Sequence, residues 1–287
     1  MSARAKWVAS CIALTADQVR DIAVHDRGLC PELARELQQG RFAGWAWPHL
    51  WIWGGNATSA RYLAIPKAGS SSVREAMRSS YGLRDRWGGE WQESRGMFRE
   101  DASHWPNEAQ RSWFGWTLVD DPVSHFIGGW ATQGGKVVAN GVLIRNETER
   151  SHCADVPEYL EMLNSTTPDT RKRDVHLAPQ LLIIRSAIAQ GGSLSFVGHL
   201  PDIATEWGRL RTAMEDAGAR PFARALPHLR NASSQPECRA QMGAHGSAQT
   251  VPPASLRILC SYLLEDFVCL DFPFPDACLL EPNSVTL

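Results

Sequence analysis

The sequence of 287 residues contains no apolar run close to the roughly 20 residues that a membrane-spanning helix needs. It also lacks an excess of charge, because charged residues make up 21% of the chain and the formal net charge is −2. A nucleic-acid-binding protein usually has a strongly basic face, so this balance argues against such a partner, although it leaves room for a local basic cleft. Hydrophobic residues make up 44% of the chain, enough to bury the core of one large domain or of a domain with appendages.

Several catalytic motifs are absent as well. The sequence has no C-x-x-C pair and no H-E-x-x-H, so it predicts no metal site. A G-x-S-x-G nucleophile elbow is also absent. The nucleotide-binding signature G-x-x-x-x-G-K-[ST] is missing too, which disfavours an ordinary ATPase loop.

What the sequence does contain is a junction between a short apolar segment and a polar loop. The segment YLAIPKAGSSSVREAM, residues 62–77, begins with an apolar run that stops at Pro66, as a buried strand does when it ends at a turn. Apolar residues from Val73 onward recur at helical spacing and predict a helix over 71–81, which Gly82 is placed to end. The predicted order is therefore strand, loop and helix.

The loop of this junction carries groups that bind anions. Its backbone N–H groups and the first turn of the helix converge on one point, where the helix dipole favours negative charge. Gly69 allows a close backbone approach, and Lys67 adds a full positive charge. Hydroxyl donors come from Ser70, Ser71 and Ser72. These features predict a site for phosphate or sulfate; the alternative is a serine-rich turn that only caps the helix.

Five segments of the chain resemble, in order, the carbohydrate sulfotransferases, Golgi enzymes that transfer a sulfuryl group from 3′-phosphoadenosine-5′-phosphosulfate (PAPS) to a sugar hydroxyl. IPKAGSSSV at 65–73 resembles that family's 5′-phosphosulfate loop, P-K-x-G-[ST]-[ST]-S. WTLVDDPVSHFIGGW at 116–130 resembles its 3′-phosphate segment, a strand followed by R-D-P-x-x-R-x-x-S-x-[YW]. Three lesser blocks follow in the family's order: DVHLAPQ at 174–180, LSFVGHLPDIATEWGRL at 194–210 and LPHLRNAS at 226–233. The resemblance covers residues 60–275 and implies a sulfotransferase-type fold, with PAPS as cosubstrate and a glycan as acceptor.

The resemblance also implies roles for individual residues. Lys67 would neutralise the leaving phosphate, and His104 is the candidate base that takes the proton of the acceptor hydroxyl. The residues assigned to the cofactor are Lys67, Ala68, Gly69, Ser70, Ser71, Ser72, Asp121 and His125. Glu90, Glu93 and Glu100 stand behind His104 as alternative bases. His176 would orient a loop or touch the acceptor.

Two positions depart from the family's pattern. Asp120 stands where the family has an arginine, and Gly128 stands where it has a serine. An aspartate repels a phosphate, so Arg74 or Arg230 would have to compensate. These departures favour one alternative, a non-catalytic relative that binds a glycan or nucleotide without turning it over. A nucleotide kinase with a variant phosphate loop is a third reading.

The rest of the chain alternates between predicted strands and helices. YLAIP precedes the helix 71–81, FGWTLV precedes a helix over 123–131, and LSFVGHL precedes a helix over 202–217. This alternation predicts an α/β fold with a P-loop-like parallel sheet flanked by helices. We expect an N-terminal helical and tryptophan-rich extension over 1–58, the α/β domain over 59–275 and a tail over 276–287. A helix is expected over 17–39, and residues 258–272 are expected to form a closing helix followed by a short extended piece.

Other features bear on the compartment. Four N-x-[ST] sequons, at Asn56, Asn146, Asn164 and Asn231, and a cysteine group toward the C-terminus, Cys238, Cys260, Cys269 and Cys278, suit a glycoprotein with one or two disulfides in the secretory pathway. Seven cysteines leave at least one thiol over. Residues 1–18 read as a short signal peptide or, as we favour, an ordinary helix. The family resemblance adds a Golgi-lumen location with a peripheral or lost membrane anchor. Twelve tryptophans fill the core or stack on sugar rings.

Overall fold

The computed structural model describes residues 1–35, 50–53, 59–81, 113–133, 138–139, 142–143, 175–189, 191–223, 226 and 251–280. The chain divides into two compact units, each built from three separate stretches. Unit 1 comprises Met1–Ala9, Ala46–Asp120 and Ile183–Arg230, and unit 2 comprises Ser10–Trp45, Asp121–Leu182 and Asn231–Leu287. The predicted domain boundaries at residues 58 and 275 stay a prediction.

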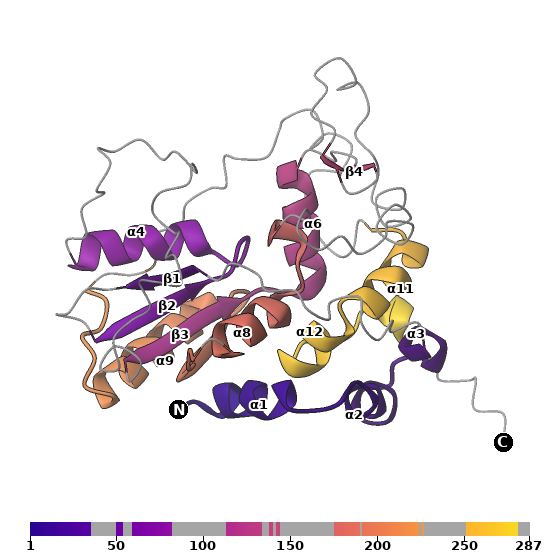
Figure 1. The fold of residues 1–287 in the computed structure, drawn as a ribbon, viewed down its shortest axis with the longest axis horizontal. Coiled ribbons are helices and arrows are strands. Elements are labelled where there is room, and N and C mark those ends of the chain that lie inside the picture. Colours follow the sequence, from indigo (N-terminus) through magenta and orange to yellow (C-terminus); the bar gives the residue numbers. More distant parts are fainter. Residues whose placement is uncertain are drawn as a thin grey trace, which may run out of the picture. The chain divides into compact units, whose positions relative to one another are not determined.

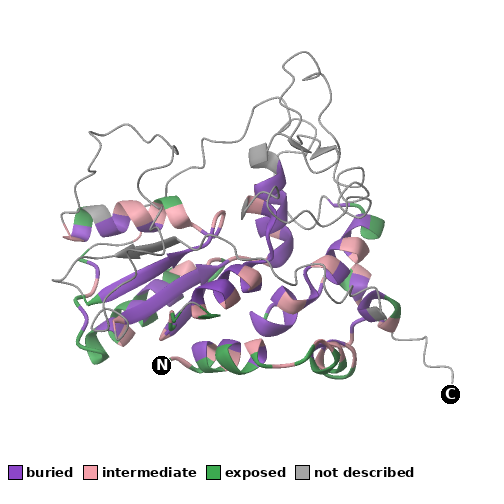
Figure 2. Ribbon diagram, in the orientation of Figure 1, coloured by how far each residue is buried: buried purple, intermediate pink, exposed green. Residues whose placement is uncertain are grey.

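Unit 1 is built on a four-stranded sheet flanked by helices (Figure 1). Its strands are β1 (Leu50–Trp53), β2 (Ala60–Ala64), β3 (Phe114–Val119) and β6 (Phe196–His199), in the order β1-β2-β3-β6. β2, β3 and β6 run parallel, and β1 pairs antiparallel to β2 at one edge. All residues of the three parallel strands are buried, as strands covered on both faces are (Figure 2). The predicted α/β class with a parallel sheet is confirmed.

One face of this sheet packs against α4 (Ser70–Tyr81) and α9 (Ile203–Asp216) in an aromatic core. Alternate side chains of neighbouring strands meet there, because strand residues alternate between the two faces. Tyr62 on β2 lies 4.4 Å from Trp116 on β3, measured between ring centroids, and Trp207 on α9 stacks on Phe222 at 4.6 Å. Trp116 and Trp207 are buried, so for these two tryptophans the core-filling interpretation is confirmed.

The opposite face of the sheet buries polar groups. Arg61 on β2 is fully buried and donates from Nη2 to the carbonyl of Ser193 at 3.2 Å and to its Oγ at 2.7 Å. Burial lowers the pKa of Arg61 to about 10. Gly115 on β3 makes this arrangement fit, since a Cβ there would lie 1.9 Å from the carbonyl oxygen of Ser193. Thr117 donates to the carbonyl of Leu63 at 2.8 Å.

The N-terminal segment forms helix α1 (Ala3–Ile12), as the favoured reading of the sequence predicts. Its start lies against β6, because the amide of Ser2 donates to the carbonyl of Ser195 at 2.8 Å. Arg4 donates to Glu206 of α9 at 2.8 Å and to the carbonyl of Val197 at 3.1 Å. Glu206 is 2% exposed, so Arg4 neutralises a buried carboxylate.

Unit 2 is mainly helical. Its elements are α2 (Ala16–Asp21), the π-helix η1 (Ile22–Asp26), α3 (Pro31–Arg35), the hairpin β4 (Val138–Ala139) and β5 (Val142–Leu143), α6 (Pro122–Gln133), η5 (Val175–Leu177), α11 (Pro253–Tyr262), α12 (Leu264–Cys269) and η7 (Asp276–Cys278). α8 (Gln180–Ala189) begins in unit 2 and continues into unit 1. Trp130 on α6 is buried.

The single helix predicted over 17–39 is wrong, whereas the closing helix predicted from 258, followed by an extended piece, is confirmed with a break at Leu263. The helix expected over 17–39 breaks after η1, where Gly28 has a φ of +70° and Leu29 forms a β-bridge with Leu279. Pro31 then begins a new helix, as proline at a first helical position does. The closing helix expected from 258 toward 272 starts earlier and divides at Leu263 into α11 and α12.

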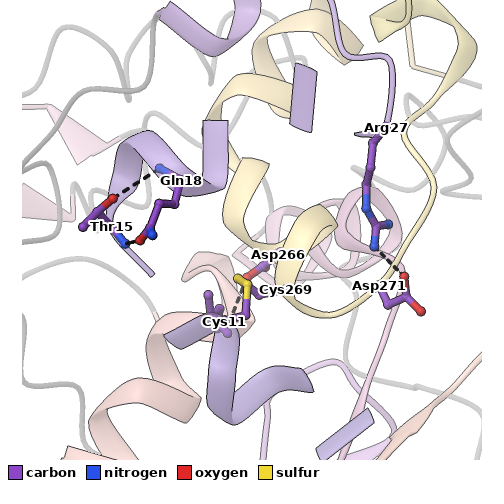
Figure 3. Close-up of a disulfide and its surroundings, with 8 residues drawn as sticks. Cys11, Thr15, Gln18, Arg27, Asp266, Cys269 and Asp271 are labelled. Carbon is purple, nitrogen blue, oxygen red and sulfur yellow. Dashed lines mark hydrogen bonds and ion pairs between the residues drawn. A yellow bond between two sulfur atoms is a disulfide. The ribbon is translucent and has the colours of Figure 1, made fainter. Parts of the chain in front are cut away.

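Within the described residues of unit 2, two disulfides crosslink the chain. Cys11 pairs with Cys269, as Figure 3 shows, and Cys260 pairs with Cys278, while Cys30 keeps a buried thiol. The expectation of one or two disulfides in the C-terminal cysteine group is confirmed for Cys260 and Cys278, whereas Cys269 pairs with Cys11, which no sequence feature indicated. Such bonds are consistent with an oxidising, secretory-type compartment. Among the residues that the structure describes, no helix is long and apolar enough to span a membrane.

Candidate anion-binding site

The carboxyl ends of β2, β3 and β6 lie at one edge of the unit 1 sheet, because the three strands are parallel. The loop that contains Lys67 follows β2, Asp120 follows β3, and Leu200 follows β6. The amide of Leu200 donates to the carbonyl of Val119 at 2.8 Å, which holds the last two strand ends together. Open sheets of this type bind ligands beyond their carboxyl edge.

The loop after β2 is a tight turn with a strained lysine. Residues 66–69 form the turn, which the amide of Ala68 closes by donating to the carbonyl of Ile65 at 3.3 Å. Lys67 has a φ of +65°, a left-handed conformation that costs a residue with a Cβ about 1 kcal/mol. Such strain persists where the surroundings impose it, and it concentrates at functional sites.

Gly69 is required by the same turn. Its φ is +73°, and a Cβ at this position would lie 2.9 Å from Cδ1 of Leu200. The loop therefore passes close to the end of β6, and only a glycine combines this backbone conformation with this spacing. The sequence-based role for Gly69, a close approach of the backbone, agrees with its geometry.

Helix α4 begins directly after the turn, at Ser70, one residue before the predicted start. The amide of Val73 makes the first helical bond, to the carbonyl of Gly69 at 3.1 Å. The first turn contains no acidic residue. Amides at the start of a helix have no acceptor within the helix, and the helix dipole is positive there, so this terminus suits an anion. Arg74 lies one turn further on and donates from Nε to the carbonyl of Ser70 at 3.2 Å.

The predicted 3′-phosphate segment begins helix α6 of unit 2. Asp121 caps this helix, since its Oδ1 accepts from the amide of Ser124 at 2.8 Å, and Pro122 is the first helical residue. The predicted capping role of this pair is confirmed. His125 donates its amide to the carbonyl of Asp121 at 2.8 Å, and its side chain is only 1% exposed. The predicted phosphate contacts of Asp121 and His125 stay predictions.

The DVHLAPQ block lies next to α6. A Cβ at Gly129 would be 2.0 Å from the carbonyl oxygen of His176, so α6 and η5 pack backbone against backbone. Gln180 then begins α8, where its amide and that of Leu181 donate to the two carboxylate oxygens of Asp266, each at 2.8 Å. Asp266 on α12 is fully buried. This helix terminus therefore holds an anion that the protein itself supplies.

Sequence reasoning did not find three of these groups. Asp266 could have been noticed as an acidic residue inside an apolar helical segment, LLEDFVCL, but nothing in the sequence identifies its partner. Arg61 could have been noticed because it is a charged residue within the apolar strand segment ARYLAI. Burial raises the pKa of Tyr62, and the nearby charge of Arg74 partly opposes this shift. The hydroxyl of Tyr62 has no hydrogen-bond partner among the residues that the structure describes.

Several predicted residues lie outside the part of the chain that the structure describes. They are the candidate base His104, the alternatives Glu90, Glu93 and Glu100, the cation Arg230, the cysteine Cys238 and the sequons at Asn56, Asn146, Asn164 and Asn231. The residues that the structure does describe contain no group of three or more His, Cys, Asp or Glu side chains that could hold a metal ion.

Comparison with protein-family models, with curated proteins and with solved structures finds no match for this chain.

Proposed function

We propose that this protein is a sulfotransferase that moves a sulfuryl group from PAPS to a carbohydrate hydroxyl. The observation that carries the proposal is the turn between β2 and α4, where Lys67 is held at a φ of +65° beside a helix terminus without acidic residues. A surface turn without a binding role would more commonly place glycine or asparagine at this position, because these residues adopt a positive φ at a lower free-energy cost than lysine.

The cosubstrate would bind through its 5′-phosphosulfate at this turn. The ammonium group of Lys67 would neutralise the charge that develops on the leaving phosphate. The first amides of α4 and the hydroxyls of Ser70, Ser71 and Ser72 would donate to its oxygens. The position of the turn at the carboxyl edge of a parallel sheet supports this assignment, because α/β folds bind phosphorylated ligands there. A P-loop-like, sulfotransferase-type fold is part of the proposal.

The remainder of the cosubstrate is assigned by the resemblance alone. Asp121 and His125 occupy the positions of the family's 3′-phosphate segment, and Asp120 brings a negative charge where the family has a positive one. Arg74 is a cation on the second turn of α4 that would offset this charge.

The reaction would be a direct in-line displacement. The oxygen of the acceptor hydroxyl attacks the sulfur, the bond from sulfur to the bridging oxygen of the phosphate breaks, and adenosine 3′,5′-bisphosphate leaves. A base takes the proton of the hydroxyl, the role proposed for His104. The enzyme chiefly positions the two reactants and stabilises charge on the leaving phosphate, so neither a metal nor a covalent intermediate is needed.

The test is transfer of label from ³⁵S-labelled PAPS to a panel of glycans. The proposal expects labelled glycan with the wild type and at least 100-fold slower transfer with Lys67→Ala, the usual loss when a charge-stabilising group is removed. Arg211→Ala is the matched control, because Arg211 is an exposed cation on α9 of the same unit and should leave transfer unchanged. Absence of label with every glycan, under conditions in which the protein is folded, would contradict an enzymatic role.

A second candidate function is binding without turnover, by a relative that keeps the fold. It is favoured by Asp120 at the end of β3 and by the burial of His125, which leaves its imidazole 1% exposed. This candidate expects adenosine 3′,5′-bisphosphate or a glycan to bind while no sulfate is transferred. Titration with both ligands next to the label assay distinguishes the two functions.

The proposal includes a location in the Golgi lumen, as a glycoprotein held at the membrane. The two disulfides of unit 2 support an oxidising compartment of this kind. Treatment of the protein from secreting cells with an N-glycosidase tests the sequons, since a glycoprotein should lose mass and an unmodified chain should not.

A further inference from the structure

Unit 2 brings three of its cysteines to one place. Cys260 on α11 and Cys278 in η7 form a disulfide, and Cys30, which directly precedes α3, carries a thiol. The segments of Cys30 and Cys278 pair as a short antiparallel bridge centred on Leu29 and Leu279. The amide of Cys30 donates to the carbonyl of Cys278 at 3.0 Å, which puts these two residues directly opposite each other.

This pairing gives Cys30 and Cys278 a Cα separation that a disulfide bond between them could span. Only one of the two possible bonds is made, because the amide of Cys278 donates to the carbonyl of Pro275 at 2.8 Å within η7. Residues opposite each other in an antiparallel pair have Cα atoms about 4.5 to 5.5 Å apart. Disulfide-bonded residues have Cα atoms separated by about 4.4 to 6.8 Å. Cys30 is therefore placed as a second partner for Cys278, in addition to Cys260.

Charged groups surround the Cys30 sulfur. The thiol donates a hydrogen bond to the carboxylate of Glu32, which can take up its proton. The guanidinium of Arg257 lies 3.6 Å from the sulfur through Nη2 and donates from Nη1 to the carbonyl of Ala277 at 3.1 Å. Arg257 lies on α11, three residues before Cys260. One cation thus joins the thiol, the segment of Cys278 and the helix that carries Cys260.

We propose that these residues form an intramolecular thiol–disulfide exchange site. Cys30 gives its proton to Glu32, and the thiolate attacks Sγ of Cys278. A bond between Cys30 and Cys278 forms, the bond between Cys278 and Cys260 breaks, and Cys260 leaves as a thiolate that takes up a proton. One disulfide and one thiol exist before and after the step, so no oxidant or reductant is consumed. The crosslink of η7 moves from α11 to the segment that leads into α3.

The site is tested by mapping disulfides after an acid quench, which stops exchange, followed by alkylation and mass spectrometry. In Cys260→Ser the thiol of Cys278 has lost its partner, and glutathione disulfide supplied as the oxidant should join it to Cys30, so the Cys30–Cys278 peptide should be the main species and alkylation of Cys30 should fall at least fivefold relative to the wild type. Cys278→Ser is the matched control, because it removes the shared sulfur and should leave both Cys30 and Cys260 fully alkylated. The second measurement uses the unchanged protein after incubation at pH 8.5, where the same peptide is expected together with alkylated Cys260.

The Cys30–Cys278 peptide in the wild type, or in a Cys260→Ser protein with a native circular dichroism spectrum, supports the proposal. Its absence from both proteins overturns the proposal, as does a Cys30–Cys260 disulfide in Cys278→Ser. If Cys260→Ser does not fold, the result with the wild type decides alone.

Discussion

The N-termini of α8 and α4 differ in whether the protein places a negative charge beside them. The start of α8 is filled by the protein's own anion, because both carboxylate oxygens of the buried Asp266 accept backbone amides there at 2.8 Å. The first turn of α4 has no acidic residue, and a lysine in a left-handed conformation and three serines stand beside it. The dipole of each helix favours negative charge at its start, but the structure supplies that charge only at α8.

This difference in local charge distinguishes the start of α8, which has a structural role, from the start of α4, which is a candidate binding site. At α8 the charge is permanent and inaccessible, so it can contribute only to stability. At α4 the first turn has no acidic residue, Lys67 and Ser71 are at least partly exposed, and the backbone of Lys67 is strained. Stability would be better served by a capping aspartate, as Asp121 shows at α6. We therefore interpret α4 as the terminus whose anion comes from outside.

The largest expected effect is at α8. Asp266→Ala leaves two buried amides without their charged acceptor and should lower the free energy of unfolding by about 3 kcal/mol. Asp266→Asn retains one oxygen acceptor and should cost about half as much, roughly 1.5 kcal/mol. Urea denaturation followed by circular dichroism measures both. Equal stability of wild type and Asp266→Ala would show that this terminus does not need its anion.

A second prediction concerns the start of α4, where a substitution can add the negative charge that α8 already has. Ser71→Asp adds a carboxylate to the exposed first turn and should weaken binding of adenosine 3′,5′-bisphosphate by about 2 kcal/mol, roughly 30-fold, through repulsion. The same charge should stabilise the helix by about 0.5 kcal/mol. Ser71→Asn is the control of equal size without charge. An affinity that Ser71→Asp leaves intact would place the ligand elsewhere.

The geometry of the α4 turn can be tested without changing a charge. Gly69→Ala forces a Cβ into a φ of +73° and to within 2.9 Å of Leu200, which should lower stability by about 1.5 kcal/mol. Gly208→Ala, within α9, has no atom within 4 Å of the new Cβ and should raise stability by about 0.8 kcal/mol. Thermal melts of the two variants should therefore shift in opposite directions. Shifts in the same direction would mean that the turn is not constrained as described.

The smallest effect concerns Tyr62, which packs in the core beside α4 and feels the charge of Arg74. Its buried hydroxyl has no partner in the described part of the chain, so Tyr62→Phe should stabilise the protein by about 1 kcal/mol at neutral pH. Burial raises the pKa of Tyr62 above its ordinary value near 10, so the folded protein keeps the proton that the unfolded chain releases. Wild-type stability should fall as the pH rises above 10, and Tyr62→Phe should lose less. Parallel pH profiles for the two proteins would contradict this shift.

Much of the sheet could be predicted from the sequence. FGWTLV is the strand β3 residue for residue, and the helices after β2, β3 and β6 begin within one residue of the expected positions. These elements are local: an apolar run, a glycine or proline, and then helical spacing are enough to define them. The turn with Lys67 and Gly69 was identified for the same reason.

The parts that failed depend on contacts between distant segments. The helix predicted over 17–39 is interrupted because Leu29 pairs with Leu279, about 250 residues away, and no local signal records that partner. Cys11 likewise pairs with Cys269, and Asp266 caps a helix 85 residues before it. Burial of His125 follows from packing within unit 2 rather than from its own neighbours in sequence.

The central claim is that Lys67 and the start of α4 bind the phosphosulfate end of a nucleotide. Isothermal titration with adenosine 3′,5′-bisphosphate tests it most directly, with wild type and Lys67→Ala compared at equal thermal stability. The account predicts saturable binding to the wild type and at least tenfold weaker binding to Lys67→Ala. No binding to the wild type, or equal affinity in both proteins, would contradict it.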